Sequence, residues 1–301
     1  MTRVGIRHLS FTLGEEKIWY RDLPAIEERI QTLQIPDDEE LWEWGWCRRA
    51  TRDYDAHVAH GYGDVVRYVQ ASGVRIDAVL ACGPVQHDAE RFAERLSADV
   101  LPQIDGAAGR LRRIDDFDCA NVLQGVADAR ALIASGAENV LVLAGEKLEN
   151  EQIRFRSYSV FSDFTFALLL SADTAGCDYE VLDLEMRRDE QPAEDTSRIL
   201  VRTLEKEIGV ALLARNGISA EDVTKFFYLN LFPPIAEMKT KDSGFAARHF
   251  YSEARESGHC YGADPFMNLD GYFANGGGGE LHVLCASGRG HAGVSLVRRL
   301  R

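Results

Sequence analysis

Residues 112–148 constrain the fold of this chain more than any other segment, because they read as a strand, a helix and a strand in succession. Between residues 120 and 133 the apolar side chains recur at three- and four-residue steps, which is the period of a helix. Gly136 follows where a C-terminal helix cap is expected. Residues 139–145 form a short run rich in Val and Leu, typical of a strand buried on both faces of a mainly parallel sheet. The segment therefore predicts a layered α/β fold.

Cys119 stands where the first strand of this segment gives way to the helix. Unpaired backbone N–H groups and the helix dipole favour a thiolate at such a position, so a lowered thiol pKa is expected. Cysteine is also among the residues most often buried, and a cysteine at a strand–helix junction is commonly a small core residue. The junction alone leaves both interpretations open.

Strands and helices are predicted to alternate along the rest of the chain, on both sides of residue 175. The patterns predict strands over residues 3–13, 77–82, 164–171, 179–187, 225–231, 281–286 and 293–297, and helices over 53–73, 88–97 and 196–215. Residues 15–50 look irregular and carry tryptophans at alternate positions from 42 to 46. Without a linker between the halves, we expect two intimate units, residues 1–175 and 176–301.

Composition excludes several classes of function. A formal net charge of −14 argues against binding to nucleic acid or to anionic membranes, both of which need clustered Lys and Arg. The six cysteines contain no C-x-x-C pair, so neither a metal site nor a disulfide scaffold is predicted. The first residues lack the apolar core of a signal peptide, and no apolar run is long enough to span a membrane. These features predict a reduced cytoplasmic protein.

Three motifs together resemble the thiolase superfamily, and β-ketoacyl-acyl-carrier-protein synthase III in particular. They are Cys119-Ala-Asn-Val-Leu-Gln-Gly with the helix and strand that follow, Phe161-Ser-Asp163, and the glycine-containing ending of residues 285–297. The resemblance covers most of the chain, more thinly before residue 75 and over residues 185–225. It implies a thiolase-like fold of two similar α/β halves with buried central helices, and it identifies Cys119 as the nucleophile.

The chain departs from the condensing enzymes of that family at two positions. Asn230 stands where a histidine is expected, and His259 stands where an asparagine is expected, with Asp264 five residues later. This order is similar to a sub-branch of acyltransferases with a Cys-His-Asp arrangement. The resemblance implies that His259 is the general base, Asp264 orients it and Asn230 donates a hydrogen bond in the pocket. His291, near the terminal loop, is the reserve candidate for the base.

The same resemblance implies the remaining contacts. Backbone N–H groups of Cys119 and of the terminal loop would form an oxyanion hole; the loop residues are Ser287, Gly288, Arg289 and Gly290. Four residues are weaker candidates for contact with the carrier protein or coenzyme A, namely Trp46, Arg48, Arg49 and Arg112. For these basic and aromatic side chains, a solvated or packed surface is the ordinary alternative.

The function implied is transfer of an acyl group from an acyl carrier protein or coenzyme A thioester, through acyl-Cys119, to an oxygen or nitrogen nucleophile of a small molecule. No cofactor is expected to stay bound, because the phosphopantetheine arrives with the donor. Homodimers and a place in specialised-metabolite biosynthesis are further expectations. The alternatives are decarboxylative carbon–carbon condensation, a thioesterase that uses water as acceptor, and a non-catalytic partner subunit.

Overall fold

The computed structural model describes residues 3–83, 88–107, 109–115, 117–188, 204–242, 245, 249–288 and 290–301. Its strands are β1 (Val4–Leu13), β2 (Glu16–Trp19), β3 (Trp46–Arg49), β4 (Ala78–Cys82), β5 (Leu111–Ile114), β6 (Asn139–Glu146), β7 (Phe164–Ser171), β8 (Tyr179–Arg188), β9 (Lys225–Phe227), β10 (Phe250–Tyr251), β11 (Leu281–Gly288) and β12 (His291–Arg299). Its α-helices are α1 (Ile26–Leu33), α2 (Glu39–Trp42), α3 (Tyr54–Gly61), α4 (Gly63–Ser72), α5 (Ala89–Arg95), α6 (Asn121–Ala134), α7 (Leu204–Arg215), α8 (Pro233–Asp242), α9 (Ala254–Ser257) and α10 (Asp264–Ala274).

Ten strands form one sheet whose order contains the same pattern twice. The order is β5-β4-β6-β7-β1 and then β8-β12-β11-β9-β10, so that each strand of the first five has a counterpart in the second five. The pairing repeats as well, because β4 is parallel to β5 and β6 as β9 is to β10 and β11, and the remaining pairs are antiparallel. The two patterns join through the antiparallel contact of β1 with β8. The chain thus folds as two similar halves.

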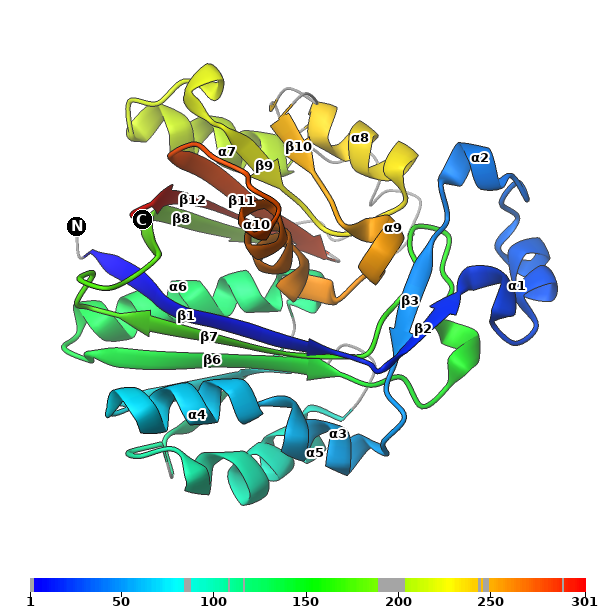
Figure 1. Cartoon of the computed structure of the whole chain (residues 1–301). Coiled ribbons are helices and arrows are strands. Elements are labelled where there is room, and N and C mark those ends of the chain that lie inside the picture. Colours follow the sequence, from blue (N-terminus) through cyan, green and yellow to red (C-terminus); the bar gives the residue numbers. More distant parts are fainter. Residues whose placement is uncertain are drawn as a thin grey trace.

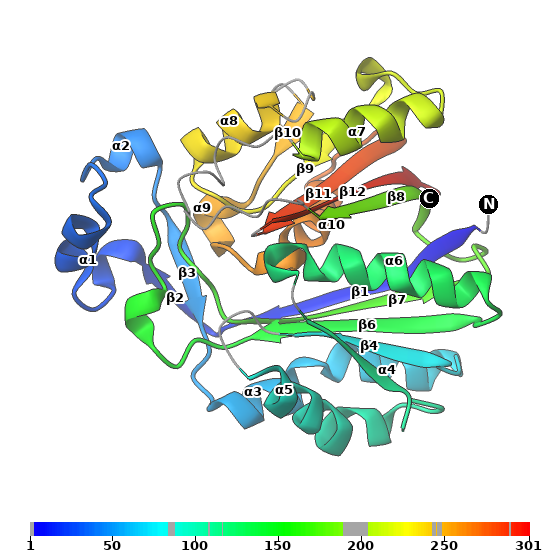
Figure 2. The ribbon, with the colours of Figure 1, turned by 180° about the vertical axis from the view of Figure 1, so that it is seen from behind.

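Helices α6 and α10 occupy equivalent places in the two halves and lie between the two parts of the sheet (Figures 1 and 2). Helix α6 contacts β4 and β6 of the first half and also β8 and β12 of the second. Both of its faces are therefore covered, and Gly125 lets it approach the sheet, where an added Cβ would lie 2.8 Å from Cys82 Sγ. The outer faces carry α3 and α4 on one side and α7 on the other.

Strand β6 shows why this sequence forms a buried sheet. Every residue of β6 after Asn139 is buried, and so is every residue of the adjacent β7. Helices cover both faces of these strands, so their Val- and Leu-rich runs need no polar alternation. The predicted strand over residues 139–145 is confirmed, and Gly136 has the positive φ of 106° that a C-terminal helix cap requires.

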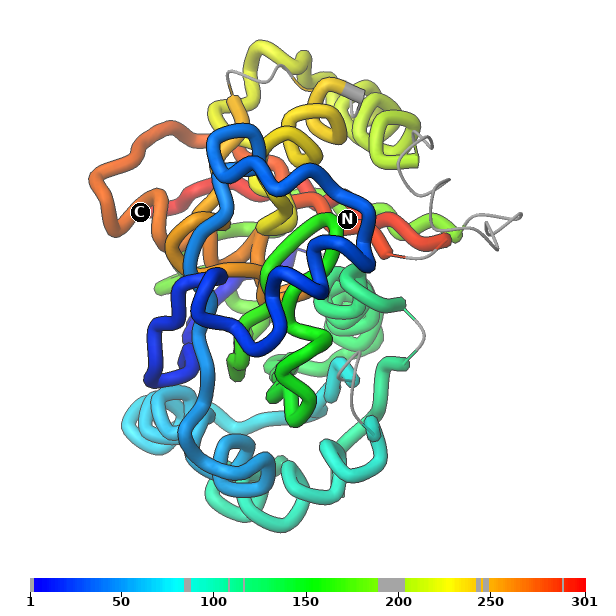
Figure 3. Tube along the Cα trace, turned by 90° about the vertical axis from the view of Figure 1, so that its right-hand side faces the viewer, coloured from blue at the N-terminus to red at the C-terminus, as the bar shows by residue number. Residues whose placement is uncertain are grey.

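Two predictions about secondary structure are wrong. The single helix over residues 53–73 is two helices, α3 and α4, which meet at Tyr62, whose buried hydroxyl donates to the carbonyl of Ala144 at 2.7 Å. Residues 15–50 are not irregular, because they form β2, β3, α1 and α2 and cover the end of the molecule that faces the viewer in Figure 3. Trp44 is fully buried in an apolar cluster that this segment forms together with Phe155, Val160 and Phe232.

The other predicted elements appear with shifted ends. The strand expected over residues 225–231 stops at Phe227 as β9, whereas the two final strands are longer than expected. The helix expected over residues 196–215 is present as α7 from Leu204, and its first part lies outside the described residues. No helix in the described part of the chain is long and apolar enough to cross a membrane.

Candidate active site

Cys119 lies in a tight 3₁₀ turn, Asp118–Ala120, which leads directly into α6. Asp118 has the left-handed φ of 44°, an uncommon conformation for a residue other than glycine. Gly288, at the end of β11, packs against this turn so closely that an added Cβ would lie 2.4 Å from the Cβ of Asp118 and 3.1 Å from the backbone nitrogen of Cys119. The turn and the strand together hold the nucleophile candidate in place.

His259 and Asp264 occupy the corresponding place in the second half, immediately before and at the start of α10. The His259 N–H donates to the carbonyl of Val160 at 2.7 Å, and the Ser162 N–H donates to the carbonyl of His259 at 3.0 Å. These two bonds attach the histidine to a segment of the first half. The side chains of His259 and Asp264 are both fully buried.

The structure brings Cys119, His259 and Asp264 into one hydrogen-bonded chain. Cys119 Sγ lies 3.4 Å from His259 Nε2, and His259 Nδ1 is hydrogen-bonded to Asp264 Oδ2. The Asp264 carboxylate also accepts the backbone N–H of Cys260 and that of Asn230, each at 2.7 Å. Hydrogen bonds of this kind stabilise a buried carboxylate in its charged form. The charged carboxylate favours the tautomer with hydrogen on Nδ1, which leaves Nε2 free to accept a proton.

The thiol of Cys119 is not the low-pKa group that the helix dipole predicts. Desolvation raises the pKa of the Cys119 thiol well above its ordinary value, and the charges of Asp118 and Asp264 raise it further. The positive end of the helix dipole would lower the pKa of the thiol, whereas burial raises it, and the effect of burial is the larger of the two. With a raised pKa, the thiol needs a base to take its proton before it can act as a nucleophile, and His259 Nε2 is the nitrogen within hydrogen-bond distance.

Asn230 supports the aspartate and does not offer its side chain to a substrate, contrary to the prediction. Its Nδ2 donates to the carbonyl of Gly258 at 2.9 Å and to the hydroxyl of Ser257 at 3.3 Å. Its Oδ1 accepts hydrogen bonds from the Asn268 amide at 2.9 Å and the Ser252 hydroxyl at 3.0 Å. Because the amide is fully used, only the backbone N–H of Asn230 reaches the catalytic group, through Asp264.

Of the terminal loop, residues 287–290, only a part lies beside Cys119. Gly288 contacts the turn of Cys119, as described above, but the side chain of Ser287 is hydrogen-bonded to Tyr228 Oη at 2.8 Å. Gly290 has a positive φ of 71° in the turn to β12, and Arg289 lies outside the described residues. His291 packs its ring against Phe117, with centroids 4.8 Å apart, whereas the hydrogen bond to Cys119 is made by His259.

Arg154 is a buried residue near the site that the sequence did not single out. Its guanidinium is fully buried and bonded to Asp163 at 3.0 and 3.2 Å, to Glu151 and to the carbonyl of Phe161. Asp163 also accepts the backbone N–H groups of Ala50 and Leu148. This cluster stiffens the segment that carries the backbone of His259. These partners of Arg154 all lie within residues 151–163, but no local sequence pattern shows that the arginine among them is buried.

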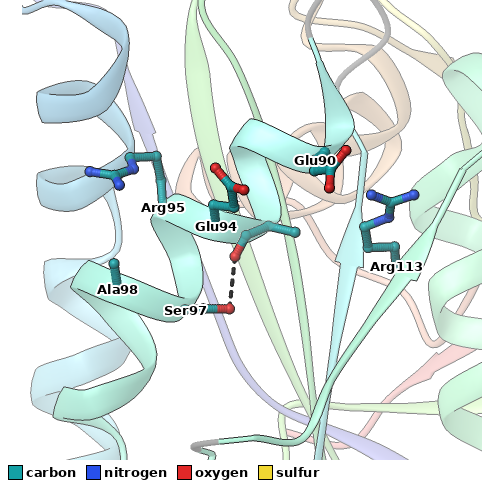
Figure 4. A pocket seen from close by; sticks show the side chains of 7 residues that line it. Glu90, Glu94, Arg95, Ser97, Ala98 and Arg113 are labelled. Carbon is teal, nitrogen blue, oxygen red and sulfur yellow. Dashed lines mark hydrogen bonds between the residues drawn. The ribbon is translucent and has the colours of Figure 1, made fainter.

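The candidate carrier contacts do not lie together. Trp46, Arg48 and Arg49 are neighbours on β3, in the small second sheet, whereas Arg112 is exposed on β5 of the main sheet. Arg49 is paired with Glu16 at 2.7 Å, and Lys17 lies over the Trp46 ring. A separate groove of about 630 Å³ lies beside α5. Its lining includes the charged side chains of Glu94, Arg95 and Arg113, which Figure 4 shows. That groove contains none of the three catalytic candidates.

Among the described residues, no three His, Cys, Asp or Glu side chains gather in a way that would hold a metal ion. All six cysteines are free thiols. The hydrogen-bonded chain at this site consists of a thiol, an imidazole and a carboxylate in sequence.

Comparison with known proteins identifies the fold. No family model matches the chain, and no curated protein matches it in sequence. Solved structures do match over nearly its whole length. One described as "ChlB3 [Aceyltransferase]" has a TM-score of 0.72 and 17% identity over 99% of this chain and 98% of its own. The 3-oxoacyl-(acyl carrier protein) synthase III of Pseudomonas aeruginosa PAO1 has a TM-score of 0.70 and 17% identity over 98% of both chains.

A third match is a cerulenin-bound single-residue variant of OleA from Xanthomonas campestris, with a TM-score of 0.76 and 13% identity over 98% of this chain and 96% of its own. These identities are low, so the likeness speaks for the fold. The predicted fold is confirmed: this chain has the thiolase-like fold of the synthase III group.

Proposed function

We propose that this protein is an acyltransferase that works through an acyl-Cys119 thioester. The observation that carries the proposal is the continuous chain from Cys119 Sγ to His259 Nε2 and from His259 Nδ1 to Asp264. This is the order of groups that activates a nucleophile through a base, with a carboxylate orienting the base. The neighbours in structure, which include an acyltransferase and ketoacyl synthases, support acyl chemistry in general.

In the first half-reaction the site would acylate its own cysteine. His259 Nε2 accepts the proton of Cys119, and the thiolate attacks the carbonyl carbon of the incoming thioester. The tetrahedral intermediate collapses as the carrier's sulfur leaves, and His259 returns the proton to that sulfur. The backbone N–H of Cys119 and an N–H of the loop at Gly288 are the candidates to stabilise the oxyanion.

In the second half-reaction the acyl group leaves the enzyme. The hydroxyl or amine of a small-molecule acceptor gives its proton to His259 Nε2 as it attacks the acyl-Cys119 carbonyl. The Cys119 thiolate departs and regains the proton from His259. Because desolvation raises the pKa of the Cys119 thiol, its thiolate is a poor leaving group, so return of the proton by His259 has to accompany its departure.

The placement of Asn230 favours acyl transfer over decarboxylative condensation. An enolate formed from a malonyl thioester needs two neutral donors at its carbonyl oxygen. Here the Asn230 amide is occupied by four protein groups, and the imidazole of His259 is bound to a carboxylate. This arrangement leaves His259 Nε2 to accept the proton of an acceptor, so it supports acyl transfer better than condensation.

The remaining expectations stay part of the proposal. The donor is an acyl carrier protein or coenzyme A thioester whose phosphopantetheine enters and leaves with each turnover, so no cofactor stays bound. We further propose a homodimer of the kind that this fold group forms, and a place in the cytoplasm and in specialised-metabolite biosynthesis. The free thiols of all six cysteines are consistent with a reducing compartment.

Intact-protein mass spectrometry after incubation with a panel of acyl thioesters tests the proposal. The wild type should gain one acyl group, Cys119→Ala should gain none, and Cys177→Ala should behave as the wild type, because Cys177 is buried in the turn before β8. An acyl-enzyme loaded by prolonged incubation of His259→Gln should persist when alcohols and amines are added, since the base for the second half-reaction is missing.

The outcomes also separate the alternatives. If the enzyme decarboxylates a malonyl thioester and forms a β-keto product, its reaction is condensation and not acyl transfer. Release of the free acid alone would indicate a thioesterase. If no thioester acylates the wild type, the acyl-cysteine proposal is wrong and a non-catalytic partner subunit becomes the better interpretation.

A further inference from the structure

Two buried polar atoms beside the catalytic residues have no hydrogen-bond partner among the residues that the structure describes. They are Tyr261 Oη and Asn121 Oδ1. Tyr261 is 3% exposed and Asn121 is 5% exposed, so water outside the protein does not reach them freely. Buried polar groups are nearly always paired, and those that are not commonly meet a bound water or a ligand.

Tyr261 begins the 3₁₀ turn Tyr261–Ala263, between the proposed base and the residue that orients it. Its ring centroid lies 5.2 Å from that of His259 and 4.8 Å from that of Phe161. The next residue is Gly262, where an added Cβ would lie 2.9 Å from the carbonyl oxygen of Cys119. The turn that carries Tyr261 is thus packed directly against the nucleophile.

The backbone of Tyr261 is also held in an unfavourable conformation. Its φ is 53°, in the left-handed region that bulky residues avoid. Strained residues of this kind cluster at sites of function. The phenol itself stays protonated, because burial raises the pKa of Tyr261 well above its ordinary value, and the nearby charges of Glu146 and Cys119 add to the effect. A protonated phenol with no partner is an available hydrogen-bond donor.

Asn121 supplies an acceptor two residues after the nucleophile. Its Nδ2 donates to the carbonyl of Gly83 at 2.8 Å, which orients the amide and leaves Oδ1 as the unpaired atom. A Cβ added at Gly262 would lie 2.6 Å from this Oδ1. The start of α6 and the turn before α10 therefore each carry one unpaired polar atom, and these two segments pack against each other at Cys119.

Building on the acyl-transfer function proposed above, we propose that Tyr261 Oη donates a hydrogen bond to an oxygen substituent of the acyl group on Cys119, so that the enzyme prefers a short hydroxyacyl thioester to an alkyl thioester of the same length. A hydroxyl substituent accepts from a phenol and has a hydrogen of its own to donate, which suits an environment with one unpaired donor and one unpaired acceptor. A plain alkyl chain would leave both atoms unpaired.

Acylation of Cys119 by three matched thioesters tests this selection. The N-acetylcysteamine thioesters of propionate, 2-hydroxypropionate and 3-hydroxypropionate differ only in the presence and position of one oxygen. Rates of adduct formation are followed by intact-protein mass spectrometry and divided by the rates with free glutathione, which corrects for intrinsic reactivity. The wild type should take one of the hydroxy thioesters about tenfold faster than the propionyl thioester, the effect of one hydrogen bond.

Tyr261→Phe removes only the hydroxyl and should reduce this ratio to about twofold or less. Tyr68→Phe is the matched control, since Tyr68 lies on α4 with its ring stacked on His8, and it should retain the full ratio. Tyr261→Phe should also unfold at a temperature no lower than the wild type, because it removes an unpaired buried hydroxyl.

Each other outcome has a distinct meaning. Normalised rates that are equal for the three thioesters, with a clear adduct on Cys119, would overturn the selection and leave the acyltransferase proposal standing. A preference that survives in Tyr261→Phe would overturn the role of Tyr261. The absence of any adduct would count against the acyl-cysteine function itself and remove the basis of the inference.

Discussion

The two halves of this molecule share one strand order but hold different parts of the proposed chemistry. In the first half, β5 leads through the turn of Cys119 into α6, and in the second half, β10 is followed by His259 and then by α10. The repeated topology brings the starts of the two central helices together. In the proposed reaction one half supplies the nucleophile and the other supplies the base, so that reaction depends on how the halves meet.

Both helix starts contain a residue with left-handed backbone beside the catalytic group. These are Asp118, with φ of 44°, and Tyr261, with φ of 53°. Such a conformation costs about 1–3 kcal/mol at each residue and persists only where the surrounding structure enforces it. Each half therefore has a turn with left-handed backbone beside its proposed catalytic side chain, and Cys119 Sγ and His259 Nε2 lie 3.4 Å apart where the two turns meet.

Asp264→Asn should produce the largest change, because it alters the second half at the group that orients the base. The amide keeps the size of the carboxylate but no longer favours hydrogen on Nδ1 of His259. We expect the rate of Cys119 acylation to fall by about 10³- to 10⁴-fold, the loss seen when the acid of a catalytic triad is replaced by its amide. Stopped time courses analysed by mass spectrometry would measure it.

The control for this substitution is Asp270→Asn, at an exposed position on the same helix, which should acylate as the wild type does. A loss smaller than tenfold in Asp264→Asn would mean that His259 does not depend on the carboxylate. The proposed chemistry would then need only one residue from each half, Cys119 and His259.

Arg154→Met should have the next largest effect, on stability. It removes the buried partner of Asp163 and leaves a fully buried carboxylate unpaired, which costs about 3–5 kcal/mol of unfolding free energy. The double substitution Arg154→Met/Asp163→Asn should recover part of that loss, since the orphaned charge is gone. Urea denaturation measures both, and Arg67→Met, which breaks an exposed pair with Asp64, should cost less than about 1 kcal/mol.

If Arg154→Met costs no more than Arg67→Met, the cluster around Asp163 does not hold the segment that carries His259. The first half would then contribute only the nucleophile. A large loss of stability with an unchanged acylation rate in the remaining folded protein would separate the support of the fold from the support of the site.

Gly262→Ala tests the contact between the two helix starts directly. The added Cβ would lie 2.6 Å from Asn121 Oδ1 and 2.9 Å from the carbonyl of Cys119, so something must shift. Overpacking of this kind costs about 1–3 kcal/mol, and we expect slower acylation as well because the nucleophile is displaced from the base. Gly278→Ala is the control, since nothing lies within 4 Å of the Cβ it would add. Equal stability and equal acylation rates for the two variants would contradict the tight junction.

The elements that carry the site were predictable from the sequence because their signals are local. The strand, helix and strand around Cys119 follow from hydrophobic period and a terminal glycine, and they are where they were predicted. The partnership of Cys119 with His259, 140 residues away, did not follow from period or spacing. It came from the resemblance to a family, and the geometry is compatible with it.

Several features of the site could not be predicted from the sequence, because they depend on contacts between distant parts of the backbone. The amide of Asn230 is consumed by groups on α9, α10 and the adjoining turns, which no local pattern reveals. The left-handed turn at Tyr261 and the burial of Arg154 likewise arise from packing. The pKa of Cys119 was predicted in the wrong direction, because the helix dipole is visible in sequence whereas desolvation by the assembled halves is not.

Asp118→Asn should produce the smallest change, and it isolates one cause of the protonated nucleophile. Desolvation and the charges of Asp118 and Asp264 raise the pKa of the Cys119 thiol, so removal of the Asp118 charge should lower that pKa. Asparagine tolerates the left-handed φ of this position, and the turn should therefore stay intact. Alkylation of Cys119 by iodoacetamide at pH 8 should become about two- to tenfold faster, and the midpoint of its pH profile should move to lower pH.

Asp128→Asn, on the helix α6 that follows the turn of Asp118 and farther along the chain from Cys119, is the matched control and should alkylate as the wild type does. Because the thiolate is the reacting species, the rate reports the fraction of ionised Cys119 without any acyl substrate. An unchanged rate in Asp118→Asn would show that the charge of Asp118 does not raise the thiol's pKa, which leaves desolvation and the charge of Asp264 as its causes. The first half would then suppress the resting thiolate by burial only, and His259 of the second half would remain the sole means of activating it.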